Sequence, residues 1–404
     1  MPKLTWTVLN GATDITSKVL SMTITQGREK YFDNYSGGSC TFTIDNTNDY
    51  AQNIVYGNVI TATTDILNNE FTCYFWVQEI DFQDYPGNTG LPLATVTAVD
   101  WISRSGRVFA NALVLPEEQC SVQFNEFAAT EGGPLPADML YQFTNEDDSV
   151  ASASTYTGSV NNYLNLLAMT ERGYISLREN ILYFIQRSGV AAYPPIATTF
   201  GPTSSTVTIA YDTFDRIQNG LQFVNTATVS PEGLTEQTAV NTTSLTAYGP
   251  ASYSVTTVDY TVEQALGNAQ WVATNFSEPA TLHFRISIND LSQNATALTS
   301  WMVQCWGAIN PVNTISYQIP GGSLTWVQVL TEGFTINVTP AQTRFDLNLS
   351  PLQYYQFFIL DDPVFGMLGG AGTIVYDQAV ITYDQPGWVY NDTNADDTAA
   401  RLGW

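Results

Sequence analysis

The sequence predicts a mainly β protein with a small α+β insertion and a C-terminal β domain. Three observations support this class. Short runs that alternate apolar and polar residues, rich in β-branched side chains, recur along most of the chain. Charged residues make up only 13% of the 404 residues, about half the usual share, which disfavours a helical enzyme covered in surface ion pairs. One segment after residue 106 loses the alternation and takes on helical spacing.

The first predicted domain, residues 1–106, is a β domain. Its expected strands are residues 4–10, 19–25, 40–44, 71–79 and 93–99. Five strands in about 100 residues are enough for a sandwich or a small barrel. Gly37 and Gly38 precede one of these strands, and we expect them to provide a turn with positive φ.

The second predicted domain, residues 107–204, is the α+β insertion. One helical face is formed by Tyr163, Leu164, Leu166, Leu167 and Met169. This helix is expected to stop at Gly173. The strands 174–179 and 181–187 follow, joined by a tight turn at Glu179 and Asn180.

Two more domains are predicted. Residues 205–293 form a second β domain with a helix at 261–276, which ends before Pro279 because proline cannot continue a helix. Residues 294–404 form a C-terminal β domain and an Asp- and Asn-rich tail. The expected strands of both domains are residues 206–212, 221–230, 243–249, 248–257, 281–288, 301–309, 313–319, 324–338 and 344–351.

The net charge of −25 limits the partners of the chain. A surface this acidic repels phosphate, so specific binding of nucleic acid is not expected. The same repulsion would let DNA slide through an acidic passage without adhering. Solubility is the simpler explanation of the charge. No segment has the ~20 apolar residues that a membrane helix needs, and the first residues do not form a secretory leader.

The sequence indicates no catalytic, cofactor or metal site. The single histidine, His283, lies in a predicted strand and is expected to be packed or on the surface. No nucleophile–base pair is recognisable. The oxygens of DNTNDY, residues 45–50, resemble a calcium loop, but the glycine and closing glutamate are missing, so an Asx-capped turn is favoured. The isolated cysteines are Cys40, Cys73, Cys120 and Cys305.

The aromatic residues, 13% of the chain, suit either a protein interface or a carbohydrate platform. Trp301, Trp306 and Trp326 alternate with small residues, which favours a place in the core over a sugar-binding surface. A pair of catalytic carboxylates, as in glycosidases, cannot be located from sequence spacing.

The stretch DITSKVLSMTITQGREKYFDNYSGGSCTFTIDNTNDY, residues 14–50, resembles the N-terminal signature of minor tail proteins of long-tailed bacteriophages, the tail-tip or baseplate-hub group. The matching positions are Asp14, Thr16, Gly27, Arg28, Gly38, Asp45, Asn46 and Tyr50. Further segments similar to this group follow in the same order along most of the chain. They are residues 166–187, 248–257 with 262–279, 334–351, 358–370 and 401–404.

The resemblance implies a structural virion protein built from tail-tube-like β-barrel domains. In such hubs, two tube-like domains in each of three subunits form a pseudo-hexameric ring that adapts the sixfold tube to a threefold tip and lets genomic DNA pass. The implied partners are two further copies of the chain, the tail tube or distal tail protein, the tape measure protein, and other tail-tip or receptor-binding proteins. The implied location is the tail tip of the virion, after synthesis in the host cytoplasm. Neither an enzymatic activity nor a cofactor is expected.

The subunit interface is expected at Arg28, Lys30, Tyr31, Tyr248 and Tyr253. Arg28 can bond a carboxylate of its own chain or of a neighbour, and the alternative for Arg28 and Lys30 is an exposed loop pair. Two other functions stay open at this point. One is a carbohydrate-binding or carbohydrate-cleaving receptor-binding tail protein, and the other is a hexameric distal tail protein.

Overall fold

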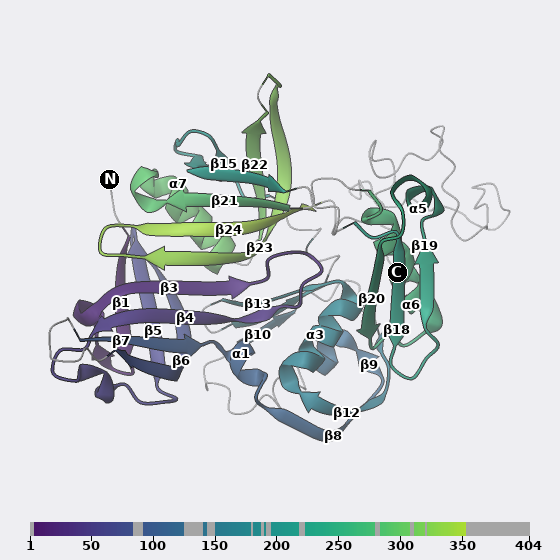
Figure 1. Cartoon of the computed structure of the whole chain (residues 1–404), viewed down its shortest axis with the longest axis horizontal. Helices are drawn as coiled ribbons and strands as arrows, with labels where there is room; N and C mark the ends of the chain where they lie inside the picture. The colour runs from purple at the N-terminus through teal and green to yellow at the C-terminus, as the bar shows by residue number, and fades with distance from the viewer. Residues whose placement is uncertain are drawn as a thin grey trace, which may run out of the picture. The chain divides into compact units, whose positions relative to one another are not determined.

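A computed structural model describes residues 4–83, 92–124, 140–143, 150–178, 181–186, 190, 195–217, 223–278, 283–307, 311–319 and 321–352. The mainly β class is confirmed: the described chain contains a large antiparallel sheet and smaller sheets packed with a few helices (Figure 1). None of the helices in these ranges has the length and apolar character needed to cross a membrane.

The N-terminal half of the large sheet has the strand order β3-β4-β7-β6-β5-β1-β2. Alternating burial along these strands places one face against a core and the other against solvent. The strands are β1 (Thr5–Asn10), β2 (Thr13–Asp14), β3 (Val19–Gly27), β4 (Ser36–Asp45), β5 (Val59–Ile66), β6 (Asn69–Gln83) and β7 (Leu93–Val99). Two short 3₁₀ helices, η1 (Thr16–Lys18) and η2 (Tyr50–Asn53), connect them.

The C-terminal half continues the same sheet with the order β16-β15-β22-β23, and β24 and β21 extend from β23 towards β17. Its strands are β15 (Thr199–Gly201), β16 (Thr208–Ala210), β17 (Thr213–Ile217), β21 (His283–Asn289), β22 (Val312–Gln318), β23 (Leu324–Val338) and β24 (Thr343–Pro351). The halves join where β3 pairs antiparallel with β23. Among the described strands the pairing does not return to its starting strand, so the barrels implied by the resemblance are present as an open sheet.

The α+β insertion contains the predicted helix and hairpin. Helix α3 (Val160–Glu171) is capped by Ser159, whose side chain accepts from the Asn162 N–H. It ends one residue earlier than expected, because Arg172 takes the left-handed conformation, with φ of 52°. Strands β13 (Tyr174–Arg178) and β14 (Ile181–Ile185) pair antiparallel as predicted. The turn at residues 179–180 lies outside the described residues.

The rest of the insertion consists of short strands. Strand β8 pairs with β12, β9 with β11, and β10 lies parallel to β14. Their bounds are β8 (Phe109–Leu115), β9 (Glu118–Gln119), β10 (Leu140–Phe143), β11 (Val150–Ala151) and β12 (Ser154–Ser159). Helix α1 (Trp101–Ser105) links β7 to this unit.

A separate three-stranded sheet, β19-β18-β20, is covered by helix α6 (Figure 1). Its elements are β18 (Thr226–Pro231), β19 (Gln237–Val240), α5 (Thr242–Tyr248), β20 (Ser252–Thr257) and α6 (Val262–Asn275). The predicted helix at 261–276 is confirmed, with a capping box in which Thr261 and Gln264 bond each other's backbone N–H groups. Residues 205–293, predicted as one domain, therefore contribute strands to two different sheets.

Two predicted strands are helical in the structure. Residues 243–249 lie almost wholly in α5, because the Asn241 side chain caps the Ser244 N–H at 3.0 Å and Gly249, with φ of 82°, ends the helix. Residues 301–307 continue α7 (Ala295–Trp301) as a π-helical turn, Met302–Gly307, after Asn294 caps the helix start. In both segments the cap at the helix start, Asn241 or Asn294, favours the helix.

Two hydrophobic cores hold the fold together. The first packs the two halves of the large sheet against α7. The second packs the insertion against the β18–β20 sheet and α6, and it includes Tyr31 and Tyr35 from the loop after β3. Gly37 and Gly38 have no positive φ and lie in β4, so the predicted turn is wrong. Their role is close packing, because a Cβ on Gly37 would overlap the backbone of Ser103.

Candidate assembly site

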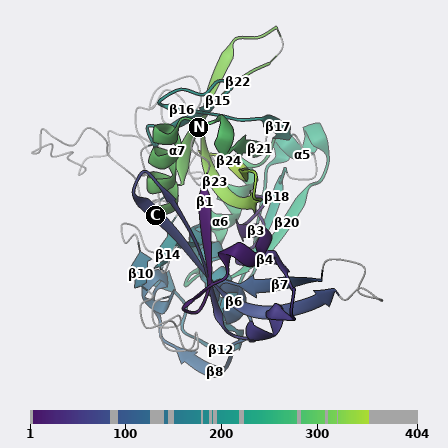
Figure 2. The ribbon, with the colours of Figure 1, turned by 90° about the vertical axis from the view of Figure 1, so that its left-hand side faces the viewer.

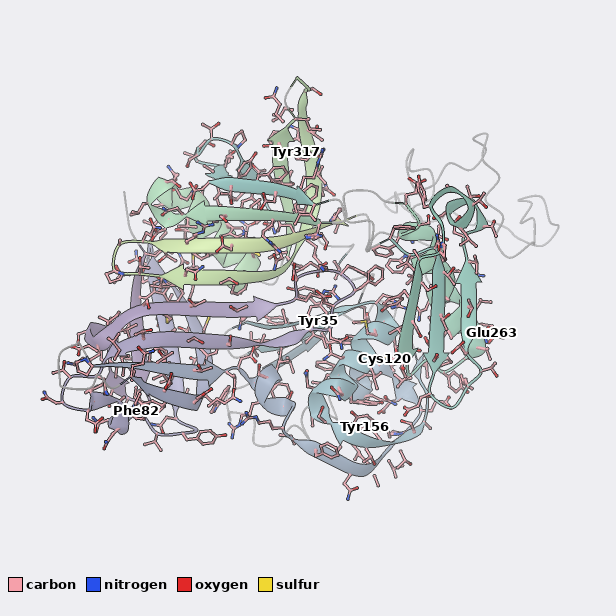
Figure 3. All side chains as sticks on the ribbon, viewed as in Figure 1. Tyr35, Phe82, Cys120, Tyr156, Glu263 and Tyr317 are labelled. Carbon is pink, nitrogen blue, oxygen red and sulfur yellow. The ribbon has the colours of Figure 1, made fainter. Side chains whose placement is uncertain are left out.

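Three of the residues expected at an interface, Arg28, Lys30 and Tyr31, lie in the loop that follows β3. Figure 3 labels Tyr35 in the same loop. The chain leaves β3 at Gly27, which has φ of 85° and pairs with Gly333 of β23. The register of β23 against β24 shifts between Thr331 and Gly333, which places a β-bulge at Glu332. The Arg28 N–H donates to the Glu332 carbonyl at 3.0 Å.

Two glycines are required where β3 pairs with β23. A Cβ on Gly333 would lie 2.6 Å from the Arg28 carbonyl oxygen and 2.7 Å from that of Gln26. A Cβ on Gly27 would overlap the Glu332 carbonyl. The backbones of β3 and β23 therefore approach too closely to admit a side chain at either glycine.

Arg28 and Glu332 form a buried ion pair. Arg28 Nε donates to Glu332 Oε2 at 2.7 Å, and the two side chains are 3% and 0% exposed. The guanidinium carbon lies 4.2 Å from the ring centroid of Tyr35 and 5.0 Å from that of Tyr31, within the range of cation–π attraction. Burying each charge costs desolvation free energy, which the attraction between the two groups offsets. Removing either side chain would leave the other as an uncompensated buried charge.

Aromatic contacts carry the loop into the second core. The Tyr31 ring lies 4.9 Å from that of Phe276, and the Phe32 ring lies 4.7 Å from that of Tyr253. Tyr35 packs edge-on against Tyr174 of β13 at 5.1 Å. Residues 28–35, which we call the junction loop, therefore contact the large sheet, the insertion and the β18–β20/α6 unit.

The Tyr35 N–H of the junction loop donates to Asn165 Oδ1 of α3 at 3.0 Å. This bond occupies a buried backbone donor that would otherwise be costly inside the protein. It also ties the loop to the helix that follows the β12 strand, so the loop is held by backbone as well as by side-chain contacts.

The structure brings three of the five expected interface residues together. Arg28 and Tyr31 are buried within the chain, and Tyr253 packs on the same aromatic group. Lys30 is half-buried, with its N–H donating to Asp33 Oδ2 at 3.1 Å. Tyr248 lies apart at the end of α5, 51% exposed and edge-on to Phe223. Of the alternatives for Arg28, the structure supplies a carboxylate of its own chain.

Sequence reasoning missed Glu332 and the aromatic partners Phe32, Tyr35, Trp271 and Phe276. Glu332 has a recognisable signal: it is a carboxylate followed by glycine in the middle of an otherwise uncharged strand, LTWVQVLTEGFTINV. Trp271 lies in α6 and Phe276 is its C-cap, about 240 positions from the loop along the chain, and local patterns do not connect them to it.

The candidate metal-binding residues in the described part of the chain, namely His283, the cysteines and Asp45, are buried or bonded locally. No group of three His, Cys, Asp or Glu among them has a metal-holding arrangement. His283 is buried in β21, and burial lowers its pKa. The four cysteines are buried and not disulfide-bonded, and burial raises the pKa of the Cys40 thiol. Asp45 accepts from the Thr47 N–H at 2.9 Å, the Asx turn expected in DNTNDY.

The fold has relatives among solved structures, although no family model and no curated protein sequence matches the chain. A tail protein from Neisseria meningitidis MC58 aligns with a TM-score of 0.60 and 12% identity, over 87% of this chain and 97% of that chain. The 43 kDa tail protein of prophage MuSo2 from Shewanella oneidensis aligns with a TM-score of 0.56 and 11% identity, over 87% and 98%. The chain thus has the fold of these two tail proteins, the fold that its N-terminal resemblance predicted.

Proposed function

We propose that this chain is a structural protein of a bacteriophage tail that forms the hub ring at the tail tip. The supporting observation is the joining of two half-sheets in one chain, through the antiparallel pairing of β3 with β23. Three copies of a chain with two such halves present six half-sheets. A threefold ring of this kind can therefore meet a sixfold tube on one side and a threefold tip on the other.

The junction loop supports this role because it makes the two halves behave as one rigid segment. The Arg28–Glu332 pair and the Gly27–Gly333 crossing fix β3 against β23. The aromatic contacts of Tyr31 and Phe32 fix the same point to α6. A subunit that carries load between a tube and a tip needs such a fixed angle, and it needs no catalytic group at that point.

The acidity of the chain fits the passage of DNA. A net charge of −25 gives each ring of three copies a strongly negative field, which keeps phosphate from adhering to the wall of a channel. In this role the genomic DNA crosses the lumen without base-specific contacts. The protein partners are the tail tube or distal tail protein, the tape measure protein, and the receptor-binding proteins of the tip.

Electron microscopy of purified particles tests the proposal. We expect density for this chain at the tip, in three copies, around a lumen whose surface potential is negative. Six copies in a ring would instead make the chain a distal tail protein. A chain absent from the particle, or one that cleaves or binds glycans in a cell-wall digestion assay or glycan array, would overturn the structural role.

A further inference from the structure

The β22–β23 hairpin extends beyond the strands on either side of it (Figures 1 and 2). Strand β15 reaches only to Ile315 of β22, and β24 reaches only to Val329 of β23. Residues 316–319 and 321–328, which we call the arm, pair only with each other within the described chain. The Gly322 N–H donates to the Ile319 carbonyl at 2.8 Å, which closes the arm with a tight turn.

The two faces of the arm differ. Tyr317 and Thr325 are cross-strand partners on the inner face, where the Tyr317 ring stacks on Phe214 at 5.0 Å and anchors the arm to the core. Leu324 and Trp326 point to the outer face and are 46% and 55% exposed. The expected place of Trp326 in the core is therefore wrong, whereas Trp301 is buried as predicted. The side chain of Trp306 lies outside the described residues.

The arm lies in a long uncharged part of an acidic chain. Residues 291–331 contain no Asp, Glu, Lys or Arg, although the net charge of the whole chain is −25. Copies of such a chain repel each other wherever carboxylates would meet, and they can approach closely only through uncharged surface. A cationic partner would instead be attracted to the acidic surface. The arm therefore suits a partner that is itself acidic.

The outer edge of the arm is also open. Within the described residues, the backbone of Leu324–Gln328 has no strand on the side away from β22, because β24 ends opposite Val329. This edge carries neither charge nor proline, the usual devices that keep an exposed edge from pairing with another chain. An unprotected edge beside an exposed tryptophan indicates a surface that is covered in the assembly.

We propose that the arm is a contact between copies of this chain, with the face of Leu324 and Trp326 docked on the neighbouring subunit. This inference rests on the proposed ring, and it names the surface that joins the ring. Trp326 acts as the central apolar anchor, and the edge of Leu324–Gln328 supplies backbone hydrogen bonds to the neighbour. The arm is held in place by Tyr317 before contact, so little ordering accompanies association.

A photo-reactive cross-linker tests which protein contacts the arm. The full-length chain carries benzoylphenylalanine in place of Trp326, and a control chain carries it in place of Tyr56, another exposed aromatic residue in an unrelated loop. Irradiation is expected to give a covalent dimer of this chain from position 326 and none from position 56. A product within one chain, or with a different tail protein in particle-producing cells, overturns the proposal.

Association of the purified chain separates this inference from the ring itself. The double variant Leu324→Ser/Trp326→Ser is expected to weaken self-association about thirtyfold or more, the effect of losing a hot-spot tryptophan, with an unchanged melting temperature. Tyr56→Ser is expected to leave association as in the wild type. If the wild type associates and the double variant does so equally well, the arm is not the contact and the ring stands. If the wild type stays monomeric, both proposals fail.

Discussion

Arg28 and Glu332 are 304 positions apart in the chain, yet Arg28 Nε donates to Glu332 Oε2 at 2.7 Å in a buried ion pair. This ion pair connects the two halves of the large sheet where β3 pairs with β23. The N-terminal motif that carries Arg28 therefore acts through a partner near the other end of the described chain. A role of Arg28 in assembly would follow from the rigidity of the subunit.

Replacing Arg28 with Met leaves the Glu332 carboxylate buried without this cation. We expect the free energy of unfolding to fall by about 3–5 kcal/mol, because an uncompensated buried charge is costly. Urea unfolding measures the change. The double variant Arg28→Met/Glu332→Leu should regain most of the loss, since it removes both charges.

The matched control for Arg28 is Arg285, which pairs with Glu29 at 2.8 Å, the two side chains being 42% and 50% exposed. Arg285→Met should cost about 1 kcal/mol or less, because exposed pairs contribute little. Equal losses from Arg28→Met and Arg285→Met would contradict the structural role of the buried pair. A stable monomer that fails only to assemble would instead place Arg28 at the subunit interface.

The elements that the sequence predicted correctly are those with local signals. Helix α6 has its capping box at Thr261 and Gln264, and the strands of the N-terminal half alternate in burial as they alternate in sequence. Residues 243–249 continue the β-like pattern of the preceding segments in sequence, but the Asn241 cap and Gly249 favour a helix. Capping by one side chain outweighs a weak composition signal over so short a segment.

The candidate site was predictable only in part. Gly27 and Arg28 belong to the recognisable N-terminal motif, and a carboxylate partner for Arg28 was expected. Its identity was not, because Glu332 reaches Arg28 through the pairing of two strands that are far apart in sequence. A long-range strand pairing depends on the whole sheet, and no local pattern encodes it.

We expect opposite effects on stability from two glycine substitutions, one where β3 pairs with β23 and one in α6. Gly333→Ala should destabilise the chain by about 1–3 kcal/mol or more, because the new Cβ meets the backbone of Arg28 and Gln26 and neither can move aside. Gly267→Ala should stabilise it by about 0.5–1 kcal/mol, because Gly267 is an exposed residue within α6 and a Cβ there would have no atom within 4 Å. Thermal unfolding of both variants tests the pair, and a stable Gly333→Ala would show that the crossing is not tight.

The aromatic side chains of the junction loop should stabilise the β18–β20/α6 unit. The Phe32 ring lies 4.5 Å from Phe276 and 4.7 Å from Tyr253, so Phe32→Ala removes packing between the loop and this unit. We expect the free energy of unfolding to fall by roughly 2 kcal/mol. Amide hydrogen exchange should become faster in α6, with a smaller change in the large sheet. Phe82→Ala, at the exposed end of β6, is the control. Faster exchange spread evenly over the chain would contradict a local role.

Asp100 should make the stability of the chain fall between about pH 4 and pH 7. Its carboxylate caps α1, accepting from the N–H groups of Ser103 at 2.9 Å and Gly38 at 2.6 Å, and burial raises its pKa from 3.8 to about 7 despite these bonds. In this range the folded chain keeps a proton that the unfolded chain has released. The free energy of unfolding therefore decreases as pH rises, by up to about 1.4 kcal/mol per pH unit from this group.

The variant Asp100→Asn isolates this effect, because it removes the titrating group while keeping an acceptor for one of the two N–H groups. Urea unfolding at several pH values should give a wild-type curve that falls relative to the Asp100→Asn curve up to about pH 7 and runs parallel to it above that pH. Asp81→Asn, which removes an exposed carboxylate on β6, should keep the wild-type slope. The N–H groups of Gly38 and Ser103 favour the ionised carboxylate, so the stability lost on deprotonation comes from burial of the charge and not from loss of these bonds. If the curves of wild type and Asp100→Asn stay parallel from pH 4 upwards, Asp100 is already ionised in the folded chain and burial does not raise its pKa.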